Sequence, residues 1–244
     1  MTERIYATDA YARNVDATVL EVDVDDGRVL LDRTVFYPGG GGQPADTGWL
    51  AIGDDRISVV RVTQDSSGVW HCWVEGALPS RGTSLYGEVD WHRRYQLMRT
   101  HTAMHALCGV VWARYQSPVT GGNMKPGEGR LDFELPDWDP EDKGPIEEEL
   151  NRQIRRELPI EISFLPRLEA DRDASLIRTK VNLLPPWLTE VRVVDIVGLD
   201  RQADGGTHVG STREVGRVRI VKVESKGRGF RRIRVALEDQ PPAE

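Results

Sequence analysis

Residues 101–105 read His101-Thr102-Ala103-Met104-His105 and place two imidazoles four positions apart. On an α-helix, side chains at positions i and i+4 lie on one face, one turn apart. Asp90 is a suitable N-cap residue, so the pattern predicts a helix over residues 91–114 that carries both histidines. We therefore expect this helix to present two nitrogen donors to the same neighbour.

A second pair of donors lies in residues 204–208, which read Asp204-Gly205-Gly206-Thr207-His208. The two segments together supply four oxygen and nitrogen donors, the number that a tetrahedral Zn²⁺ takes. Two interpretations of the Gly-Gly pair stay open: a tight turn after a strand, or a backbone free to turn both donors toward one centre. The His-x₃-His spacing is a weak signal alone, because two buried, hydrogen-bonded histidines give the same pattern. It is not the metallopeptidase motif, since Thr102 stands where a glutamate base is expected.

The other histidines and the two cysteines are interpreted as structural. His71 lies in a predicted strand and His92 at the start of the predicted helix. Cys108 is seven residues from His101, about 10 Å along a helix axis at ~1.5 Å per residue. Zinc bonds are only ~2.0–2.3 Å long, so one ion should not bridge both residues. Cys108 and Cys72 are therefore expected to be core residues.

The first 90 residues are typical of β structure. Short segments rich in β-branched residues predict strands over residues 17–24, 28–32, 56–63, 69–74 and 84–89. Several short strands at close spacing predict a small N-terminal β-barrel. Between two of them stand four consecutive glycines, residues 39–42, followed by Gln43. Consecutive glycines cost chain entropy, so we expect the backbone to come close to another group here.

The remainder predicts an α+β body. Its elements are a helix over residues 145–158, a short helix over 170–180, strands over 130–134, 159–165 and 191–197, and a hairpin of 218–223 with 232–237. Residues 119–123, which contain Gly121 and Gly122, are expected to form a loop. The change in composition predicts two domains, residues 1–90 and 91–244, in an α+β protein.

Composition excludes several classes of protein. The chain has 244 residues, of which 39% are hydrophobic, and a mean hydropathy of -0.45. No apolar run approaches the roughly 20 residues that a membrane span needs. The N-terminus has no apolar signal-peptide core, and two cysteines make no disulfide framework. We expect a cytoplasmic protein without a membrane partner.

The net charge of -7 argues against a general nucleic-acid binder, but the charge is uneven. Residues 213–234 contain nine lysines and arginines and only two acids. A solvated surface hairpin explains this run equally simply. The loop over residues 225–229, Ser-Lys-Gly-Arg-Gly, favours phosphate contacts, because glycines expose backbone N–H groups beside the charges.

Five motifs in this order resemble the editing domain of alanyl-tRNA synthetase and the free-standing AlaX editing proteins. They are the glycine-rich stretch from Thr34 to Gly48, His101-x₃-His105, residues 200–209, Thr212-x-Glu214-Val215-Gly216 and residues 225–232. The resemblance spans about residues 15 to 238, and the chain shows no ATP-using aminoacylation module. It implies the editing-domain fold of alanyl- and threonyl-tRNA synthetases after the barrel, and a trans-editing factor rather than a synthetase.

The resemblance implies a hydrolase that removes wrongly attached serine or glycine from tRNA(Ala). The bond to be cut is the ester between the amino acid and the ribose of the terminal adenosine. A second selection step is useful because binding separates such similar substrates by only ~1–3 kcal/mol. The expected cofactor is one Zn²⁺ ion, and the expected partner is the acceptor end of mischarged tRNA(Ala). The oligomeric state stays open, with a monomer favoured.

The resemblance also assigns roles to particular residues. The metal ligands are His101, His105, Asp204 and His208; the catalytic or pocket residues are Gln43, Thr34 and Thr102; the substrate-binding glycines are Gly40, Gly41, Gly42, Gly121, Gly122, Gly205 and Gly206; and the tRNA contacts are Lys226, Arg228, Arg231 and Arg232.

One residue departs from the family pattern. Asp204 stands where the family has cysteine. A carboxylate is a harder ligand than a thiolate, so weaker Zn²⁺ binding and readier acceptance of other ions are expected. Alternatively a water replaces Asp204 at the metal. A non-catalytic tRNA-binding module with a degenerate site, and a metallohydrolase of small esters or amides, are the competing functions.

Overall fold

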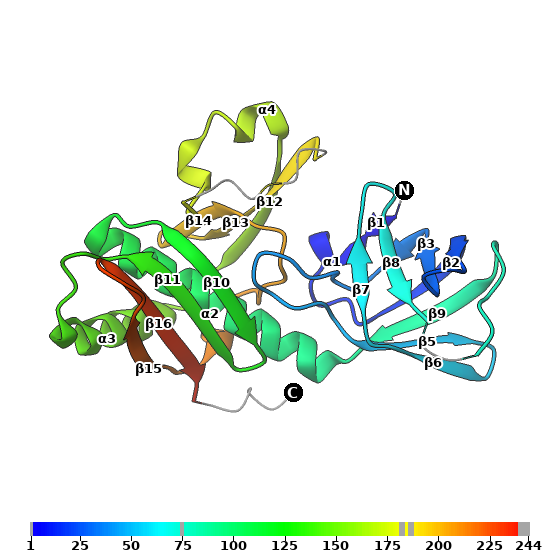
Figure 1. Cartoon of the computed structure of the whole chain (residues 1–244), viewed down its shortest axis with the longest axis horizontal. Coiled ribbons are helices and arrows are strands. Elements are labelled where there is room, and N and C mark those ends of the chain that lie inside the picture. Colours follow the sequence, from blue (N-terminus) through cyan, green and yellow to red (C-terminus); the bar gives the residue numbers. More distant parts are fainter. Residues whose placement is uncertain (1, 74–75, 181–183, 185–187, 239–244) are drawn as a thin grey trace. The chain divides into compact units, whose positions relative to one another are not determined.

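The structure, a computed structural model, describes residues 2–73, 76–180, 184 and 188–238. It is an α+β protein in which strands outnumber helices (Figure 1). The chain forms two compact units, residues 1–40 with 44–95 and residues 41–43 with 96–244. In the described part of the chain, no helix is both long and apolar enough to cross a membrane. The domain boundary near residue 90 stays a prediction.

The first unit contains a seven-stranded antiparallel sheet in the order β6-β5-β9-β2-β3-β8-β7. Its strands are β2 (Asn14–Asp23), β3 (Arg28–Leu31), β5 (Gly48–Ile52), β6 (Asp55–Val59), β7 (Val62–Gln64), β8 (Val69–Cys72) and β9 (Ser84–Val89). A short strand β1 (Glu3–Arg4) pairs in parallel with β4 (Arg33–Thr34), and α1 (Ile5–Thr8) follows β1. The described pairs leave β6 and β7 as edges, so they do not confirm a closed barrel.

Most of the predicted strands of this unit are confirmed, with two differences. The segment over residues 56–63 divides into β6 and β7, and β5 was not predicted. The predicted end of the fourth strand, Val74, lies outside the described residues. Gly48 can begin β5 because its backbone lies against β9, where an added Cβ would be 2.8 Å from Cα of Val89.

A buried ion pair holds the residues on either side of the glycine-rich segment in place. Arg94 and Asp46 pair with side chains almost completely buried, and Arg94 Nε donates to both carboxylate oxygens at 2.9 Å. Asp46 also accepts from the backbone N–H of Tyr37 at 2.6 Å, while Arg94 donates to the carbonyl of Ala10 at 3.0 Å. These contacts fix both ends of the segment that carries the four glycines.

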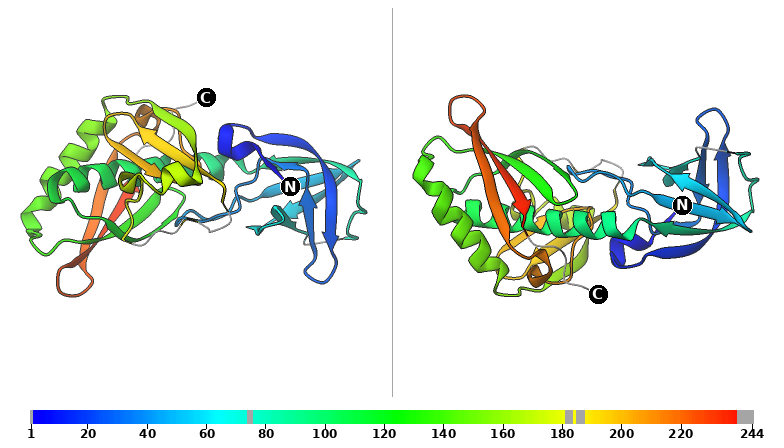
Figure 2. Two further views of the ribbon diagram at one scale, coloured as in Figure 1. Left: turned by 90° about the horizontal axis from the view of Figure 1, so that it is seen from above. Right: turned by 90° about the horizontal axis from the view of Figure 1, so that it is seen from below.

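The second unit contains the long helix α2 (Trp91–Tyr115) from residue 96 onward and a four-stranded antiparallel sheet. The sheet order is β10 (Val119–Lys125), β11 (Glu128–Glu134), β16 (Phe230–Leu237) and β15 (Val218–Ser225). The sheet packs closely on α2, because an added Cβ at Gly129 would lie 3.0 Å from Cγ of Met104. The predicted helix over 91–114 and the predicted hairpin are confirmed. Both views of Figure 2 show the tip of the β15–β16 hairpin projecting from this unit.

The loop predicted over residues 119–123 is wrong. This segment is the first part of β10, in which Gly122 pairs with Leu131 of β11. Glycine has low strand propensity, so the pattern did not indicate a strand. Pairing with β11 stabilises it, and the Leu131 side chain, whose Cδ2 would lie 3.2 Å from an added Cβ at Gly122, leaves little room for a side chain.

A three-stranded antiparallel sheet completes the second unit. Its order is β12 (Ile160–Pro166), β13 (Glu190–Ile196) and β14 (Asp200–Ala203), and α3 (Lys143–Ile154) precedes it in the chain. The helix predicted over residues 170–180 is wrong. The segment contains only the end of α4 (Arg167–Ala170) and a 3₁₀ turn, Ala174–Leu176. Thr179 instead forms a parallel bridge to Val119.

Candidate metal centre

The two predicted half-sites meet in the second unit. His101 and His105 come from α2, and Asp204 and His208 from the segment after β14. One donor atom from each residue lies within 4.8 Å of the others. The imidazole centroids are 4.3 to 4.9 Å apart. The three histidines are buried and Asp204 is partly buried. The cluster could therefore hold a metal ion.

Gly206 allows the second half-site to approach the helix. An added Cβ at Gly206 would lie 2.5 Å from Nδ1 of His101 and 2.7 Å from Oε1 of Gln43. No real Cβ tolerates such distances, so any side chain would push the segment away from α2. Gly205 has nothing within 4 Å of the same position. The close approach to α2 therefore requires a glycine at position 206 but not at position 205.

Gln43 determines which nitrogen of His101 is protonated. Its Oε1 accepts from the backbone N–H of Thr207 at 3.1 Å, and its Nε2 donates to Oγ1 of Thr207 at 2.9 Å. Because a backbone N–H can only donate, the oxygen of the amide faces this corner and lies 2.9 Å from Nδ1 of His101. Nδ1 must then carry the proton. Nε2 of His101 keeps its lone pair and lies 3.7 Å from Oδ1 of Asp204.

Thr102 contacts the third histidine. Its Oγ1 lies 3.1 Å from Nδ1 of His208 and accepts from the backbone N–H of Val209 at 3.3 Å. Nε2 of His208 is 3.1 Å from Oδ2 of Asp204. Thr102 is completely buried. Thr102, the residue directly after His101, therefore contacts the second half-site.

Arg192 holds the Asp204 segment in place through hydrogen bonds to its backbone. Its Nη1 donates to the carbonyls of Asp204 at 3.1 Å and of Gly206 at 2.8 Å, and lies 4.0 Å from Oδ2 of Asp204. The residue is buried on β13. Arg192 could not be predicted as a site residue from the sequence, because it lies inside a strand among hydrophobic neighbours and belongs to no motif.

Burial controls the protonation of the cluster. It lowers the pKa of His105 to about 4 and also lowers the pKa of His101 and His208, and neighbouring imidazoles add to the effect at His105 and His208. Burial alone would raise the pKa of Asp204, but the charge of His101 and the hydrogen bond from His208 hold it well below the ordinary value. At neutral pH the cluster holds neutral imidazoles and a carboxylate, the forms that bind metal ions.

Comparison with known proteins identifies the family. Residues 191–234 match the threonyl and alanyl tRNA synthetase second additional domain, and residues 6–93 match tRNA synthetases class II (A). The alanyl-tRNA editing protein AlaX-M of Saccharolobus solfataricus is 36% identical over 238 residues, which cover 96% of this chain and 98% of that protein. The chain belongs to the AlaX-M alanyl-tRNA editing proteins.

Two further relatives agree with this assignment. The AlaX-M protein of Methanosarcina barkeri is 36% identical over 245 residues, 98% of this chain and the whole of that protein. An alanine–tRNA ligase of Pyrobaculum calidifontis is 38% identical over 233 residues, which cover 91% of this chain but only 25% of the ligase. The chain thus matches AlaX-M proteins along their length and one part of a synthetase.

Of the four consecutive glycines, Gly41 lies beside the cluster and Gly42 lies against β10. An added Cβ at Gly41 would be 3.5 Å from Oδ1 of Asp204. The carbonyl of Gly42 accepts from the backbone N–H of Met124 at 3.1 Å, and an added Cβ would be 3.0 Å from the carbonyl oxygen of Gly122. The segment therefore reaches β10 through backbone contacts, as the run of glycines predicts. Their binding of substrate stays a prediction.

Other predicted site residues lie outside the cluster. Thr34 is completely buried in the first unit, where its hydroxyl is 2.8 Å from Nε2 of His71 and accepts from the backbone N–H of Phe36. Gly40 lies beside the hydroxyl of Tyr37 in the same unit. A contact of Thr34 with substrate stays a prediction, and His71 has the structural surroundings expected of it.

The basic hairpin is partly neutralised by ion pairs. Arg232 forms a two-point pair with Asp132, with both N···O distances 2.7 Å. Further pairs are Arg234 and Lys222 with Glu224, and Arg217 and Arg219 with Glu238. Among the described residues, no ion pair involves Lys226, Arg228 or Arg231. Lys226 and Arg228 are exposed at the hairpin tip and are thus the freer candidates for phosphate contacts.

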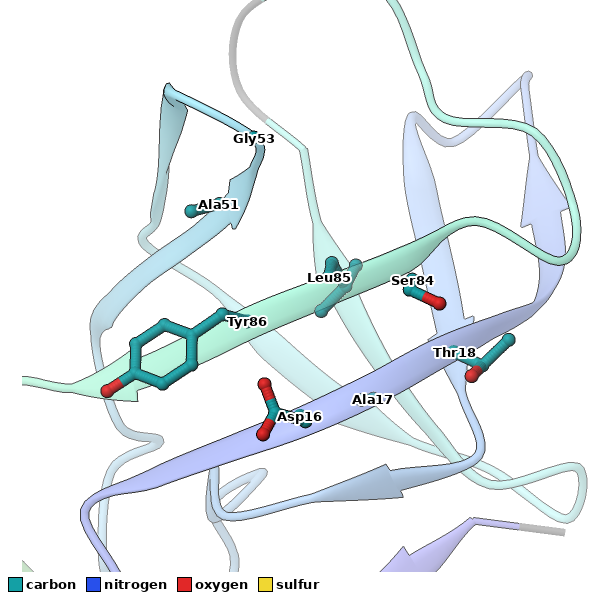
Figure 3. A pocket seen from close by; sticks show the side chains of 8 residues that line it. All are labelled: Asp16, Ala17, Thr18, Ala51, Gly53, Ser84, Leu85 and Tyr86. Carbon is teal, nitrogen blue, oxygen red and sulfur yellow. The ribbon is translucent and has the colours of Figure 1, made fainter.

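A shallow pocket lies on the sheet of the first unit, outside all the predicted site residues (Figure 3). Its lining comes from β2, β5 and β9 and from the β5–β6 turn, and includes Asp16, Thr18 and Tyr86. The open, polar lining lacks the grouped donors of a metal site. We assign it no role.

Proposed function

We propose that this chain is a free-standing hydrolase that removes serine or glycine from mischarged tRNA(Ala), with one Zn²⁺ ion in the cluster. The observation that carries the proposal is the convergence of His101, His105, Asp204 and His208 in a chain that matches AlaX-M editing proteins over nearly its whole length. The names of those relatives supply the substrate class, and the cluster supplies a site for the chemistry.

The donor set fits zinc. Three neutral imidazoles and one carboxylate give four ligands of the types that Zn²⁺ binds. A bound Zn²⁺ would supply a Lewis acid for the ester carbonyl or lower the pKa of a water molecule. With Asp204 in place of the family's cysteine, we expect weaker Zn²⁺ binding than a thiolate site would give.

The residues of the chain prepare this site in three ways. Gln43 keeps Nε2 of His101 free of a proton, and Thr102 orients His208. Arg192 and the absence of a side chain at Gly206 hold Asp204 against α2. Three of the four donors, His101, Asp204 and His208, are therefore placed by contacts that the protein makes itself. Such preorganisation reduces the reorganisation that ion binding and catalysis require.

The hairpin tip is the proposed contact for the tRNA. Lys226 and Arg228 lie beside Gly227 and Gly229 at the end of the β15–β16 hairpin. Exposed cations with glycine backbone between them suit phosphate groups, and A-form RNA is bound largely through its backbone and shape. Arg232 is less suited than the sequence suggested, because Asp132 already occupies its guanidinium.

The test is deacylation of tRNA(Ala) charged with serine, glycine or alanine. Protein treated with a chelator should lose hydrolysis of the seryl and glycyl esters and regain it on addition of Zn²⁺, while alanyl-tRNA(Ala) stays intact. Tight tRNA binding without turnover would favour the non-catalytic module. Hydrolysis of simple amino acid esters, with no preference for tRNA, would favour the small-ester hydrolase.

A further inference from the structure

A chain of buried polar groups lies beside Nδ1 of His105. Arg178 Nε donates to Oδ1 of Asp200 at 3.3 Å, and Gln202 Nε2 donates to Oδ2 of Asp200 at 2.6 Å. Nε2 of Gln202 also lies 3.2 Å from Nδ1 of His105, and Oδ2 of Asp200 lies 3.5 Å from the same nitrogen. The side chain of Asp200 is completely buried.

The packing of β14 on α2 places this carboxylate. An added Cβ at Gly109 would be 3.1 Å from Cβ of Asp200 and 2.8 Å from the carbonyl oxygen of Leu199. Gly109 follows His105 by one helical turn, so the close approach puts Asp200 beside the ring. Arg178 is held in turn, with its guanidinium 4.4 Å above the ring of Trp112. A buried carboxylate is costly unless its partners compensate, and here three polar groups surround it.

His105 needs an acceptor at Nδ1 if it is to bind a metal ion. With Gln202 donating to Nδ1, the neutral ring carries its proton on Nε2, the nitrogen on the side away from Gln202. Ion binding through Nε2 needs the other tautomer, in which that one proton sits on Nδ1. Nδ1 then donates, and the nearby acceptor is Oδ2 of Asp200. His101 already has the corresponding arrangement with Oε1 of Gln43.

We propose that Asp200 is the positioning carboxylate of His105, accepting a hydrogen bond from Nδ1–H when the ring binds an ion through Nε2. Gln202 and Arg178 hold the carboxylate in the orientation this needs. The inference rests on the metal site of the proposed function. Outer carboxylates of this kind orient imidazole ligands and raise their basicity.

The test measures Zn²⁺ affinity by competition with a chromophoric chelator, independently of any substrate. Asp200→Asn keeps the shape of the side chain but removes its charge, and it should weaken Zn²⁺ binding roughly 10- to 100-fold. The matched control is Asp195→Asn on β13, which removes a partly exposed carboxylate near Arg201. The control should keep the affinity of the unaltered protein. Equal affinities of the two variants would overturn the proposal.

A second variant restores the acceptor by another route. In Asp200→Asn/Gln202→Glu a carboxylate stands at the position of the Gln202 amide, beside Nδ1. It should recover most of the lost Zn²⁺ affinity if an anionic acceptor is what His105 needs. No recovery, in a double variant whose metal-free thermal unfolding matches that of Asp200→Asn, would count against the proposal.

A measurement on the unaltered protein remains decisive if Asp200→Asn does not fold. Nitrogen-15 NMR of the zinc-loaded protein should give His105 bound through Nε2 with a proton on Nδ1. Binding through Nδ1 would overturn the proposal. Absence of Zn²⁺ binding by the unaltered protein would overturn both this inference and the metal role in the proposed function. Normal binding with an unaffected Asp200→Asn variant would overturn this inference alone.

Discussion

The side-chain oxygen of Gln43 lies 2.9 Å from Nδ1 of His101 and also accepts from the backbone N–H of Thr207. This single amide connects the glycine-rich segment to both half-sites of the metal centre. Gln43→Leu should therefore weaken Zn²⁺ binding roughly 10- to 100-fold. Gln43→Glu keeps an acceptor in the same place and should retain most of the affinity. Chelator competition measures the Zn²⁺ affinity of both variants. Equal affinities of the Leu and Glu variants would show that Gln43 does not support the metal site.

The two glycines of the second half-site provide a matched comparison. Gly206→Ala would place a methyl group 2.5 Å from Nδ1 of His101, whereas the position at Gly205 is open. We expect Gly206→Ala to lose metal binding and deacylation, and Gly205→Ala to keep both. Metal content after dialysis and the rate of seryl-tRNA(Ala) hydrolysis are the readouts. Similar behaviour of the two variants would contradict the close approach.

His71 should make stability depend on pH. Burial lowers its pKa to about 4, so the folded form stays neutral where an exposed histidine is protonated. The unfolded chain then binds more protons below its ordinary pKa of about 6.5, and stability falls as the pH falls from there to about 4. The cost is about 2 kcal/mol between pH 7 and pH 5. Urea unfolding of the metal-free protein measures it.

The variant His71→Gln isolates this contribution. It should show a smaller loss of stability over the same pH range, even if its stability at pH 7 is lower. The hydroxyl of Thr34 faces His71, and glutamine can keep a hydrogen bond to it. An unchanged pH dependence in the variant would mean that His71 is not the buried neutral group described here.

The hairpin tip should contribute to tRNA binding through charge. Lys226→Ala/Arg228→Ala should weaken binding to tRNA, and the slope of log affinity against log salt should fall by about two. The control, Arg217→Ala/Arg219→Ala, removes one cation directly before β15 and one on it, both of which are paired with Glu238. It should have a smaller effect. Zn²⁺ affinity should stay unchanged in both, and equal effects on tRNA would argue against a specific role of the tip.

The helix of residues 91–114 and the four metal donors could be predicted from the sequence, because they depend on local spacing and on motifs. It did not reveal β10, since the two glycines disfavour a strand that pairing with β11 nevertheless stabilises. Nor did it reveal that Asp132 occupies Arg232, a contact across 100 positions of the chain. Such pairs depend on tertiary packing, which leaves no local pattern.

The positions of Asp200 and Gln202 illustrate the same limit. Both belong to the motif that resembles the editing family. The motif does not show, however, that residues 200–203 form a strand that pairs with β13. Alternation along a strand would have placed residues 200 and 202 on one face had the strand been predicted. The missing information was the strand itself, since three polar residues and an alanine give little sign of one.

The most direct measurement is hydrolysis of seryl-tRNA(Ala) by metal-free and zinc-loaded protein, at equal concentrations and with His208→Ala as the inactive reference. We expect the metal-free protein to be as inactive as His208→Ala, and added Zn²⁺ to restore activity only to the unaltered protein. Full activity of the metal-free protein would contradict the role of the His101, His105, Asp204 and His208 cluster as a catalytic metal centre.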